Sequence, residues 1–375
     1  MTTLLFFESA SFGVSKKSLD NKFISFPEVS QNQASMDNCM IVALQNEVRD
    51  RLEKEVGLNA VLLSLSDEPR FSRGLYEGKT ESLFINDSVS FHHFTDETGK
   101  ITRRVLVYYP MTFSRRGELL KYRFLRKVES AMTEEGEKYN MEIVDLRHFQ
   151  KESKFLEGRG ALNFSHNGEF VYMALSGRSN EEVLDVLCAP ENLNIPKENR
   201  FVFEIVLPRR AKNEAVHATG EDTVCYTSLG GWCGKGICAW GLEFIRFQTE
   251  EEQEAFYDHL EKNYTKIINL EEDELRAFCG NAFEVAVRKD DHERRVLCIS
   301  DAAYKALRHF KLQILKDWYG SENILVFYAD VLERRGGRSI GSLFSSPVIH
   351  GGILPVPGEL GFHEVAKLHV KDTGH

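Results

Sequence analysis

Glu157 places a carboxylate at the entrance to an expected β-hairpin. It lies in the turn at residues 156–160, where two glycines permit a tight backbone. Two apolar runs follow at residues 161–164 and 170–175, and the Asn-Gly pair between them is a strong hairpin signal. Residues 181–187 then have the spacing of an amphipathic helix with acids in its first turn. Because a carboxylate in a turn is usually solvated or caps a helix, this pattern alone leaves the function of Glu157 open.

Two histidines and one arginine near expected strands could contact a ligand. His92 shares a strand face with two serines, so its side chain could point inward, although a histidine on a strand is more often a core or rim residue. His217 lies in a polar run where a solvated histidine is usual, and it could serve as a base if this loop folded inward. Arg178 follows a strand directly, next to Gly177, and is placed to reach the mouth of a pocket.

The cysteines are candidates for a nucleophile or for metal ligands. Cys279 begins an expected strand and Cys298 has apolar neighbours, so a buried thiol acting as a small hydrophobic group is the simpler interpretation of both. Cys225, Cys233 and Cys238 lie close together in the sequence but lack the paired C-x-x-C spacing of a zinc site. We expect no metal and no cofactor.

Composition restricts the class of protein. The 375 residues, 42% of them hydrophobic and 28% charged, can bury a substantial core. A formal charge of −10 argues against nucleic acid as the main partner, because phosphate binding needs a basic face. Seven cysteines in a long chain indicate reduced thiols. The apolar runs are too short to cross a bilayer, and the N-terminal residues lack the basic leader of a signal peptide, so we expect a cytoplasmic protein without a membrane partner.

Hairpins, helices and strands alternate along the chain. Equivalent points recur at roughly 50 to 70 residues, a period that suits a closed ring of small α/β modules. We expect an N-terminal arm at residues 1–37, one ring domain at 38–347 and an irregular tail at 348–375. The expected helices are residues 40–56, 117–132, 249–262 and 301–313. The expected strands include residues 60–63, 83–91, 104–109, 142–146, 201–207, 266–270, 281–287, 295–299 and 323–328.

Several short motifs occur in an order that is similar to a known family. They are Asp87 in the run at residues 84–89, Tyr109-Pro110-Met111 with Arg115-Arg116 and Glu118, Leu156-Glu157-Gly158-x-Gly160, Leu175-Ser176-x-Arg178, Gly280-Asn281, Ile299-Ser300 and Ala303-Tyr304. The chain resembles the guanidine-modifying or pentein superfamily, and most closely the dimethylarginine hydrolases and the amidinotransferase-like citrulline hydrolases. The resemblance covers residues 38–347. It implies an α/β fold, a pseudo-fivefold propeller of ββαβ modules around a central active site.

The resemblance also implies a chemistry. A guanidinium is planar and has paired N–H donors, so carboxylates can bind it in a fork, and Asp87 and Glu157 stand where the family keeps such acids. A thiolate then attacks the central carbon while a histidine moves protons. We expect Asp87 and Glu157 to meet at the central cavity with Arg178 and His92 nearby. Without a bound cation, the repulsion of the two carboxylates would raise at least one pKa.

This chain departs from the family at both chemical positions. Tyr226 stands where the family has its histidine. The family's Gly-Gly-Gly-Ser-x-Arg-Cys run matches residues 336–342, which places Ser342 at the nucleophile. A serine hydroxyl needs a placed base, and a tyrosine with an ordinary pKa near 10 does not supply one. The family's chemistry should therefore be badly impaired here.

Three functions remain open from the sequence. The first is a binding or regulatory protein that holds a guanidine or another small cation in an acid-lined pocket without turnover. The second is an active amidinohydrolase on an arginine derivative such as methylarginine or citrulline, with a base from His92 or His217 and either Ser342 or a displaced cysteine as nucleophile. The third is an interaction scaffold that contacts a protein partner through the tail after residue 347. The sequence does not set the oligomeric state.

Overall fold

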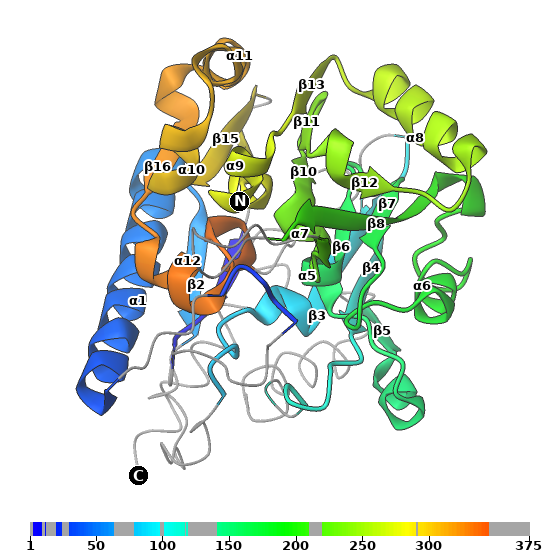
Figure 1. Ribbon diagram of the computed structural model, residues 1–375, viewed down its shortest axis with the longest axis horizontal. Coiled ribbons are helices and arrows are strands. Elements are labelled where there is room, and N and C mark those ends of the chain that lie inside the picture. The colour runs from blue at the N-terminus through cyan, green and yellow to red at the C-terminus, as the bar shows by residue number, and fades with distance from the viewer. Residues whose placement is uncertain are drawn as a thin grey trace.

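The computed structural model describes residues 3–9, 12, 20–24, 30–63, 79–97, 101–116, 118, 141–209, 220–289 and 292–344. Within them the strands form separate small sheets instead of one continuous sheet. Figure 1 shows helices α1, α6, α8 and α11 on the outside of the molecule, with the short helices α5 and α7 nearer its centre. The central part of the molecule is therefore built from turns and strand ends, and the longer helices cover the strands.

Among the described residues, four sheets repeat one topology. In each, two antiparallel strands are followed by a third strand that pairs in parallel with the second. A parallel third strand needs a crossover connection, and helices supply it in the second, third and fourth repeats, while most of the connection in the first lies outside the described residues. The repeats are β3 (Val89–Thr95), β4 (Ile101–Tyr108) and β5 (Met141–Asp145); β6 (Leu162–Phe164), β7 (Val171–Ala174), α6 (Glu181–Leu187) and β8 (Arg200–Pro208); β10 (Gly231–Cys233), β11 (Ile237–Trp240), α8 (Glu250–Asn263) and β13 (Lys266–Asn269); and β14 (Phe283–Lys289), β15 (His292–Ser300), α10 (Asp301–Ala306), α11 (His309–Tyr319) and β16 (Ile324–Phe327).

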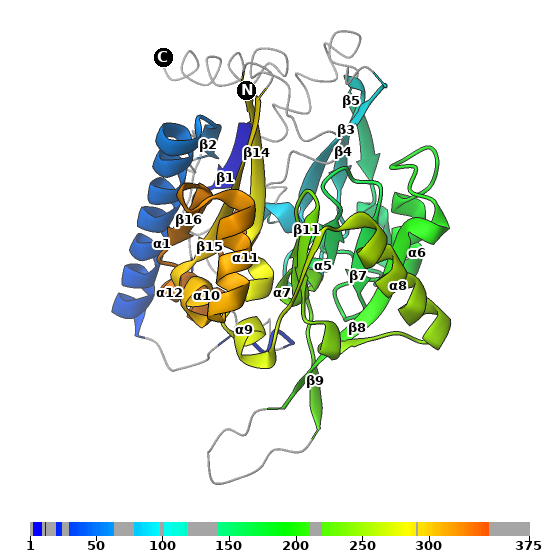
Figure 2. The same ribbon diagram turned by 90° about the horizontal axis from the view of Figure 1, so that it is seen from above.

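A fifth unit comes from the N-terminal part of the chain. The strands β1 (Thr3–Phe7) and β2 (Asn59–Leu63) pair in parallel across α1 (Gln31–Arg51) and the π-helical turn η1 (Leu52–Val56). The structure thus differs from the expected arm at residues 1–37, because both β1 and the start of α1 belong to this unit. The remaining elements are η5 (Arg147–Glu152), η6 (Lys197–Asn199), β9 (Glu221–Thr223), η7 (Leu242–Phe244), β12 (Ile245–Arg246), α9 (Glu272–Arg276), η9 (Ser321–Asn323) and α12 (Asp330–Gly336). Figure 2 shows β9 projecting away from the body of the molecule.

A short helical turn directly precedes the first strand of each of the four repeats, and a fifth turn follows α12 in the chain. These turns are η3 (Ile85–Asp87), α5 (Gly158–Ala161), α7 (Thr227–Gly230), η8 (Cys279–Asn281) and η10 (Ile340–Ser342). Contacts join η3 to α5, α5 to α7, α7 to η8 and η8 to η10. The polar interruption at Asp87, expected as a break within one strand, is thus a 3-10 turn before β3. These five turns bring residues from distant parts of the chain together.

Two helix boundaries differ from the sequence expectation. Helix α1 begins at Gln31, well before residue 40, because the Ser30 hydroxyl caps the backbone of Gln33 and the polar first turns hide the apolar period. The helix expected at 301–313 is broken at Leu307, which has an extended backbone. The following residue, Arg308, donates its backbone N–H to Glu274 Oε1 at 3.0 Å, a bond that a continuous helix would prevent. The helix expected at 117–132, apart from Glu118, and the tail at 348–375 lie outside the described residues.

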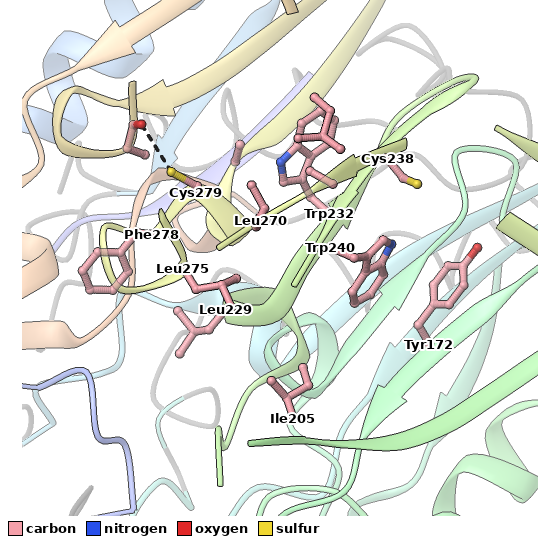
Figure 3. Packing of buried hydrophobic residues seen from close by; sticks show 14 of the residues in the cluster. Tyr172, Ile205, Leu229, Trp232, Cys238, Trp240, Leu270, Leu275, Phe278 and Cys279 are labelled. Atoms are coloured by element: carbon pink, nitrogen blue, oxygen red, sulfur yellow. Dashed lines mark hydrogen bonds between the residues drawn. The ribbon is translucent and has the colours of Figure 1, made fainter. Parts of the chain in front are cut away.

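The largest apolar cluster among the described residues extends from the second repeat through the third to the fourth. Trp240 lies beside Tyr172, with ring centroids 5.3 Å apart, and both side chains are buried. Leu229 and Leu275 extend the cluster towards α7 and α9 (Figure 3). Burial of such large side chains stabilises each by roughly 1.5–3 kcal/mol, so this cluster holds α7 against the neighbouring sheets.

Candidate functional site

Four of the central turns carry residues that the sequence selected. Asp87 ends η3, Glu157 precedes α5, Tyr226 precedes α7, and Ser342 ends η10. All four side chains are fully buried. A Cβ atom on Gly160 would lie 2.6 Å from Asp87 Oδ1 and 2.8 Å from Tyr226 Cδ1, so the glycine permits this close approach of the turns.

Arg115 joins the two carboxylates. Its Nη1 donates to Asp87 Oδ2 at 2.5 Å and to Glu157 Oε2 at 2.9 Å. Its Nη2 donates to Glu118 Oε2 at 3.0 Å. Asp87 and Glu157 therefore accept hydrogen bonds from the same nitrogen, and the cation between them belongs to the chain.

Arg178 contributes a second guanidinium to the cluster. Its Nη1 donates to Glu157 Oε2 at 3.0 Å and also to the Tyr226 hydroxyl. Its Nε and Nη2 donate to the two oxygens of Asp20 at 2.5 and 2.7 Å. Asp20 is partly exposed, while the Arg178 side chain is buried, so this N-terminal residue covers the arginine from the solvent side.

Arg338 supplies a third guanidinium, which is fully buried. Its Nη1 donates to Asp87 Oδ1 at 2.7 Å. Its guanidinium carbon lies 3.5 Å from the centroid of the Tyr226 ring and 4.7 Å from that of Phe84. A carboxylate on the edge and aromatic faces against the plane are the contacts by which proteins recognise a guanidinium.

The positive charges of the arginines stabilise the ionised form of Glu157. Burial alone would raise the pKa of Glu157, but the positive charges of Arg178 and Arg115 and a hydrogen bond from Thr112 hold it well below its usual range. Burial raises the pKa of Glu118 to about 7, although Arg115 opposes that rise. From the sequence we expected the two carboxylates to repel each other in a site without a cation, which would raise at least one pKa. The internal arginines supply positive charge, so the pKa of Glu157 is lowered instead.

Tyr226 is a hydrogen-bond donor in this arrangement. Its hydroxyl donates to Glu157 Oε2 at 2.8 Å. Burial raises its pKa well above the ordinary value, even though Arg178 and Arg338 act in the opposite direction. A phenol that stays protonated at neutral pH cannot accept a proton from a nucleophile.

Ser342 contacts an amide and no histidine in the described part of the chain. Its Oγ donates to Asn281 Oδ1 at 3.1 Å, and the same oxygen accepts the backbone N–H of Ser339 at 2.8 Å. A neutral amide oxygen is too weak a base to generate an alkoxide. The contacts shown by Ser342 are those that hold η10 against η8.

The other candidates for base and nucleophile lie in different surroundings. His92 is buried, with Nε2 2.6 Å from Ser90 Oγ and its ring 5.5 Å from that of Phe164. Cys279 donates its thiol to the backbone oxygen of Ala303 at 3.3 Å, and burial raises its pKa far above the ordinary range. Burial also raises the pKa of Cys298 to about 12. Both thiols are therefore protonated at neutral pH. His217 lies outside the described residues.

The sequence interpretation missed Arg338 and Asp20. A signal for Arg338 was present, because it stands at the third glycine position of the Gly-Gly-Gly-Ser run to which residues 336–339 are similar. Asp20 gave no local signal, since its role depends on the folding of a polar N-terminal segment over Arg178. Across the part of the chain that the structure describes, no group of three or more His, Cys, Asp or Glu side chains could hold a metal ion. Every helix in that part falls short of the length and apolar character needed to cross a bilayer.

Solved structures with a similar fold define the class of protein. The fold is similar to that of full-length ArgZ, an arginine dihydrolase of cyanobacteria, with a TM-score of 0.58 and 12% identity, covering 95% of this chain and 42% of ArgZ. The N-terminal domain of ArgZ, a cysteine-to-serine mutant bound to substrate, has a TM-score of 0.56 and 12% identity, with coverage of 93% and 99%. An AgrE mutant with L-arginine has a TM-score of 0.55 and 10% identity, with coverage of 93% and 40%. The chain thus has the pentein fold, and the expected α/β propeller is confirmed.

The family follows from a sequence comparison. The family model for eukaryotic N,N dimethylarginine dimethylhydrolase matches residues 76–341, more than half of the chain. The chain therefore belongs to the dimethylarginine dimethylhydrolase family. No curated protein sequence matches it. The chain spans less than half the length of full-length ArgZ and AgrE, and the similarity to these structures concerns the fold alone.

Proposed function

We propose that this family member does not hydrolyse guanidines, and that its central site holds the guanidinium of its own Arg338 where a ligand guanidinium would otherwise bind. The observation that carries the proposal is the surroundings of Arg338, which combine the Asp87 carboxylate with the aromatic faces of Tyr226 and Phe84. These groups would recognise a free guanidinium equally well. The ligand-binding chemistry is thus retained but used within the chain.

The groups at the two chemical positions support the absence of turnover. A thiolate nucleophile with a histidine would need a base that gains and loses a proton near neutral pH. Tyr226 instead donates to Glu157, and Ser342 donates to Asn281. Neither contact activates a nucleophile or protonates a leaving amine.

The carboxylates that we expected to line an open pocket are paired with arginines of the chain itself. Asp87 and Glu157 are fully buried and accept hydrogen bonds from Arg115, Arg178 and Arg338. A guanidine-type ligand would therefore have to displace Arg338 before it could reach Asp87. Binding by competition with an internal arginine is weaker than binding to an open site, because the ligand must first break the internal contacts.

A rescue experiment tests whether this is a guanidinium site. Arg338→Ala should lower the melting temperature strongly, since removing one partner of a buried ion pair costs about 3–5 kcal/mol. Millimolar methylguanidinium should restore part of the lost melting temperature by filling the vacated space. Arg335→Ala is the matched control, because Arg335 lies three residues from Arg338 and also pairs with an aspartate, Asp37, at 2.9 Å, but it contacts no aromatic ring among the described residues. Equal responses of the two variants, or no response of Arg338→Ala, would count against the site.

An activity assay tests the absence of hydrolysis separately. Wild-type protein should release neither citrulline nor ammonia from dimethylarginine, arginine or agmatine. Turnover that disappears in Ser342→Ala would overturn the proposal and favour the hydrolase alternative. The scaffold alternative depends on the tail at residues 348–375, and deletion of that tail with loss of a bound partner is the measurement that would favour it.

A further inference from the structure

A cavity of about 160 Å³ adjoins the central turns. Its wall includes Arg159 from α5, Phe164 from β6, Trp232 from β10 and Phe283 from β14. The lining does not include Asp87, Glu157 or Arg338, and the residues Asn281 and Gly341 separate it from the Ser342 side of η10. The volume gives room for roughly ten water-sized groups, enough for a small organic molecule.

Arg159 brings a cation into this cavity without a carboxylate partner. No ion pair or hydrogen bond of its side chain is recorded among the described residues, and its guanidinium carbon lies 5.2 Å from the centroid of the Phe283 ring. Burial lowers its pKa to about 10, so the group is still charged at neutral pH. Arg159 is only partly buried, so its charge keeps some contact with solvent, but it is less well hydrated than a surface arginine, and an anion at its free edge would offset that loss.

Two further polar groups of the lining lack partners in the described part of the chain. The Asn86 side-chain oxygen and the Ser228 hydroxyl are buried, and neither makes a hydrogen bond there. Buried polar atoms are nearly always paired, with protein, water or a ligand. These two oxygens are therefore positions at which a polar ligand, or the water that accompanies it, would be held.

The remaining charges of the lining are largely paired with one another. Glu293 lies 3.0 Å from Lys235 Nζ and 3.4 Å from Arg295 Nε. Glu284 accepts the backbone N–H of Lys235 at 3.0 Å and the Tyr319 hydroxyl at 2.5 Å. Burial and the nearby charge of Lys235 lower the pKa of the lining histidine, His166, and burial raises the pKa of the Cys233 thiol to about 12, so neither group adds a charge at pH 7. The lining holds three cations and two carboxylates, so one positive charge is in excess, and among the described residues Arg159 is the lining cation that forms no ion pair.

We propose that this cavity binds a small organic carboxylate, whose carboxylate pairs with Arg159 and whose apolar part lies against Phe283 and Trp232. A planar guanidinium can hold a carboxylate by two parallel hydrogen bonds. The aromatic walls favour a ligand with an apolar body over a fully hydrated inorganic anion. This site is separate from the central arginine cluster, so it does not depend on the function proposed for that cluster.

Binding of benzoate measures this proposal directly. Calorimetry on the full chain should detect benzoate binding at constant ionic strength, with weaker binding of acetate, because acetate lacks the apolar body. Arg159→Met should reduce the benzoate affinity at least tenfold, and Arg159→Lys, which keeps the charge but loses the planar fork, should reduce it less. Trp232 lies in the wall, so a change in tryptophan fluorescence should accompany binding.

The control variant makes the same arginine-to-methionine change at a residue outside the cavity. Arg209→Met removes a half-exposed arginine that pairs with Asp222 at 3.1 Å, and it should leave benzoate binding unchanged. If benzoate does not bind, or binds equally to wild type and Arg159→Met, the proposal fails. Tighter binding of inorganic phosphate than of benzoate would overturn the assigned ligand class. If Arg159→Met does not fold, an unchanged benzoate affinity in Arg159→Lys would contradict the forked contact.

Discussion

The guanidinium carbon of Arg338 lies 3.5 Å from the centroid of the Tyr226 ring, and both side chains are fully buried. Tyr226 therefore acts on Arg338 through its aromatic face and on Glu157 through its hydroxyl, which donates at 2.8 Å. A histidine could not combine these contacts in the same way, because its ring would carry a positive charge of its own when protonated. The exchange of histidine for tyrosine and the presence of an arginine at position 338 are thus physically compatible with each other.

The two contacts of Tyr226 can be separated by mutation. Tyr226→Phe keeps the ring but leaves Glu157 and Arg178 each without one partner, and it should destabilise the protein by about 1–3 kcal/mol. Tyr226→Ala also removes the face against Arg338 and should cost about 3–5 kcal/mol. Urea unfolding followed by circular dichroism measures both. Equal losses in the two variants would mean that the ring contributes nothing to the stability of the Arg338 site.

The close approach of the central turns gives a second prediction. Gly160→Ala would place a methyl group 2.6 Å from Asp87 Oδ1, so the turns must separate, and overpacking of this kind costs about 1–3 kcal/mol. Gly177→Ala is the matched control, since a Cβ atom there meets nothing within 4 Å. The free energy of unfolding should fall in the first variant and stay within about 0.5 kcal/mol of wild type in the second. A loss of the same size in both would show that glycine flexibility, and not the contact with Asp87, determines the result.

Much of the ring could be predicted from the sequence because most strands carry their own apolar run and several turns carry glycines. The hairpin that contains Asn167-Gly168 is an example, since β6 and β7 pair across it in the register Leu162 with Met173. The broken helix at Leu307 could not be predicted, because its cause is a hydrogen bond to Glu274, which is distant in sequence. Local pattern thus gave the elements, and long-range contacts decided where they end.

In the site, too, local sequence pattern indicated some features and long-range contacts determined the others. Asp87 and Glu157 were identifiable because they interrupt apolar runs and match a motif. That their carboxylates are neutralised internally could not be predicted, since the partner Arg338 lies 251 residues from Asp87 in the chain. Asp20 belongs to a polar segment without periodicity, and only the folded chain shows that it covers Arg178. Residue type indicated which groups could bind a guanidinium, but not which guanidinium they hold.

Glu118 should give the protein a measurable pH dependence. Burial raises its folded-state pKa to about 7, above the value of 4.5 for an exposed glutamate. The folded state therefore holds an extra proton between these pH values, and its stability should fall as pH rises from about 4.5 to about 7. Glu118→Gln cannot lose a proton and should be more stable than wild type at pH 8, by a difference on the order of 1–3 kcal/mol.

Unfolding in urea at pH 5 and pH 8 tests this prediction. The advantage of Glu118→Gln should appear at pH 8 and shrink at pH 5, and the exposed control Glu261→Gln should show no such change. The depressed pKa of Glu157 acts in the opposite direction, because its contribution is lost as pH falls below about 4.5. That effect is common to wild type and both variants, so it cancels from the difference. A constant difference between Glu118→Gln and wild type at the two pH values would contradict the shifted pKa.

The last prediction concerns Tyr226 and Ser342, which stand where the family has its histidine and its cysteine. Ser342→Cys alone should produce little turnover of dimethylarginine, because a thiol without a cationic neighbour has a pKa near 8.5 and stays mostly protonated. Tyr226→His alone should also produce little, since serine would still need a precisely placed hydrogen bond. The double variant could form a thiolate–imidazolium pair, so its gain should exceed the product of the single effects. Arg338 would still pair with Asp87, however, and exclude the substrate guanidinium.

Removal of Arg338 should therefore increase the effect of the double change. Adding Arg338→Gly to Tyr226→His and Ser342→Cys should raise the rate of citrulline release at low substrate concentration, because the substrate no longer competes with an internal guanidinium. Adding Arg335→Gly in its place should not raise this rate, since Arg335 pairs with Asp37 and, among the described residues, does not contact Asp87 or Glu157. Free methylguanidinium should inhibit the triple variant by binding at Asp87. If the wild type is already active and Ser342→Ala leaves that activity unchanged, Ser342 is not the nucleophile and the site assignment is wrong.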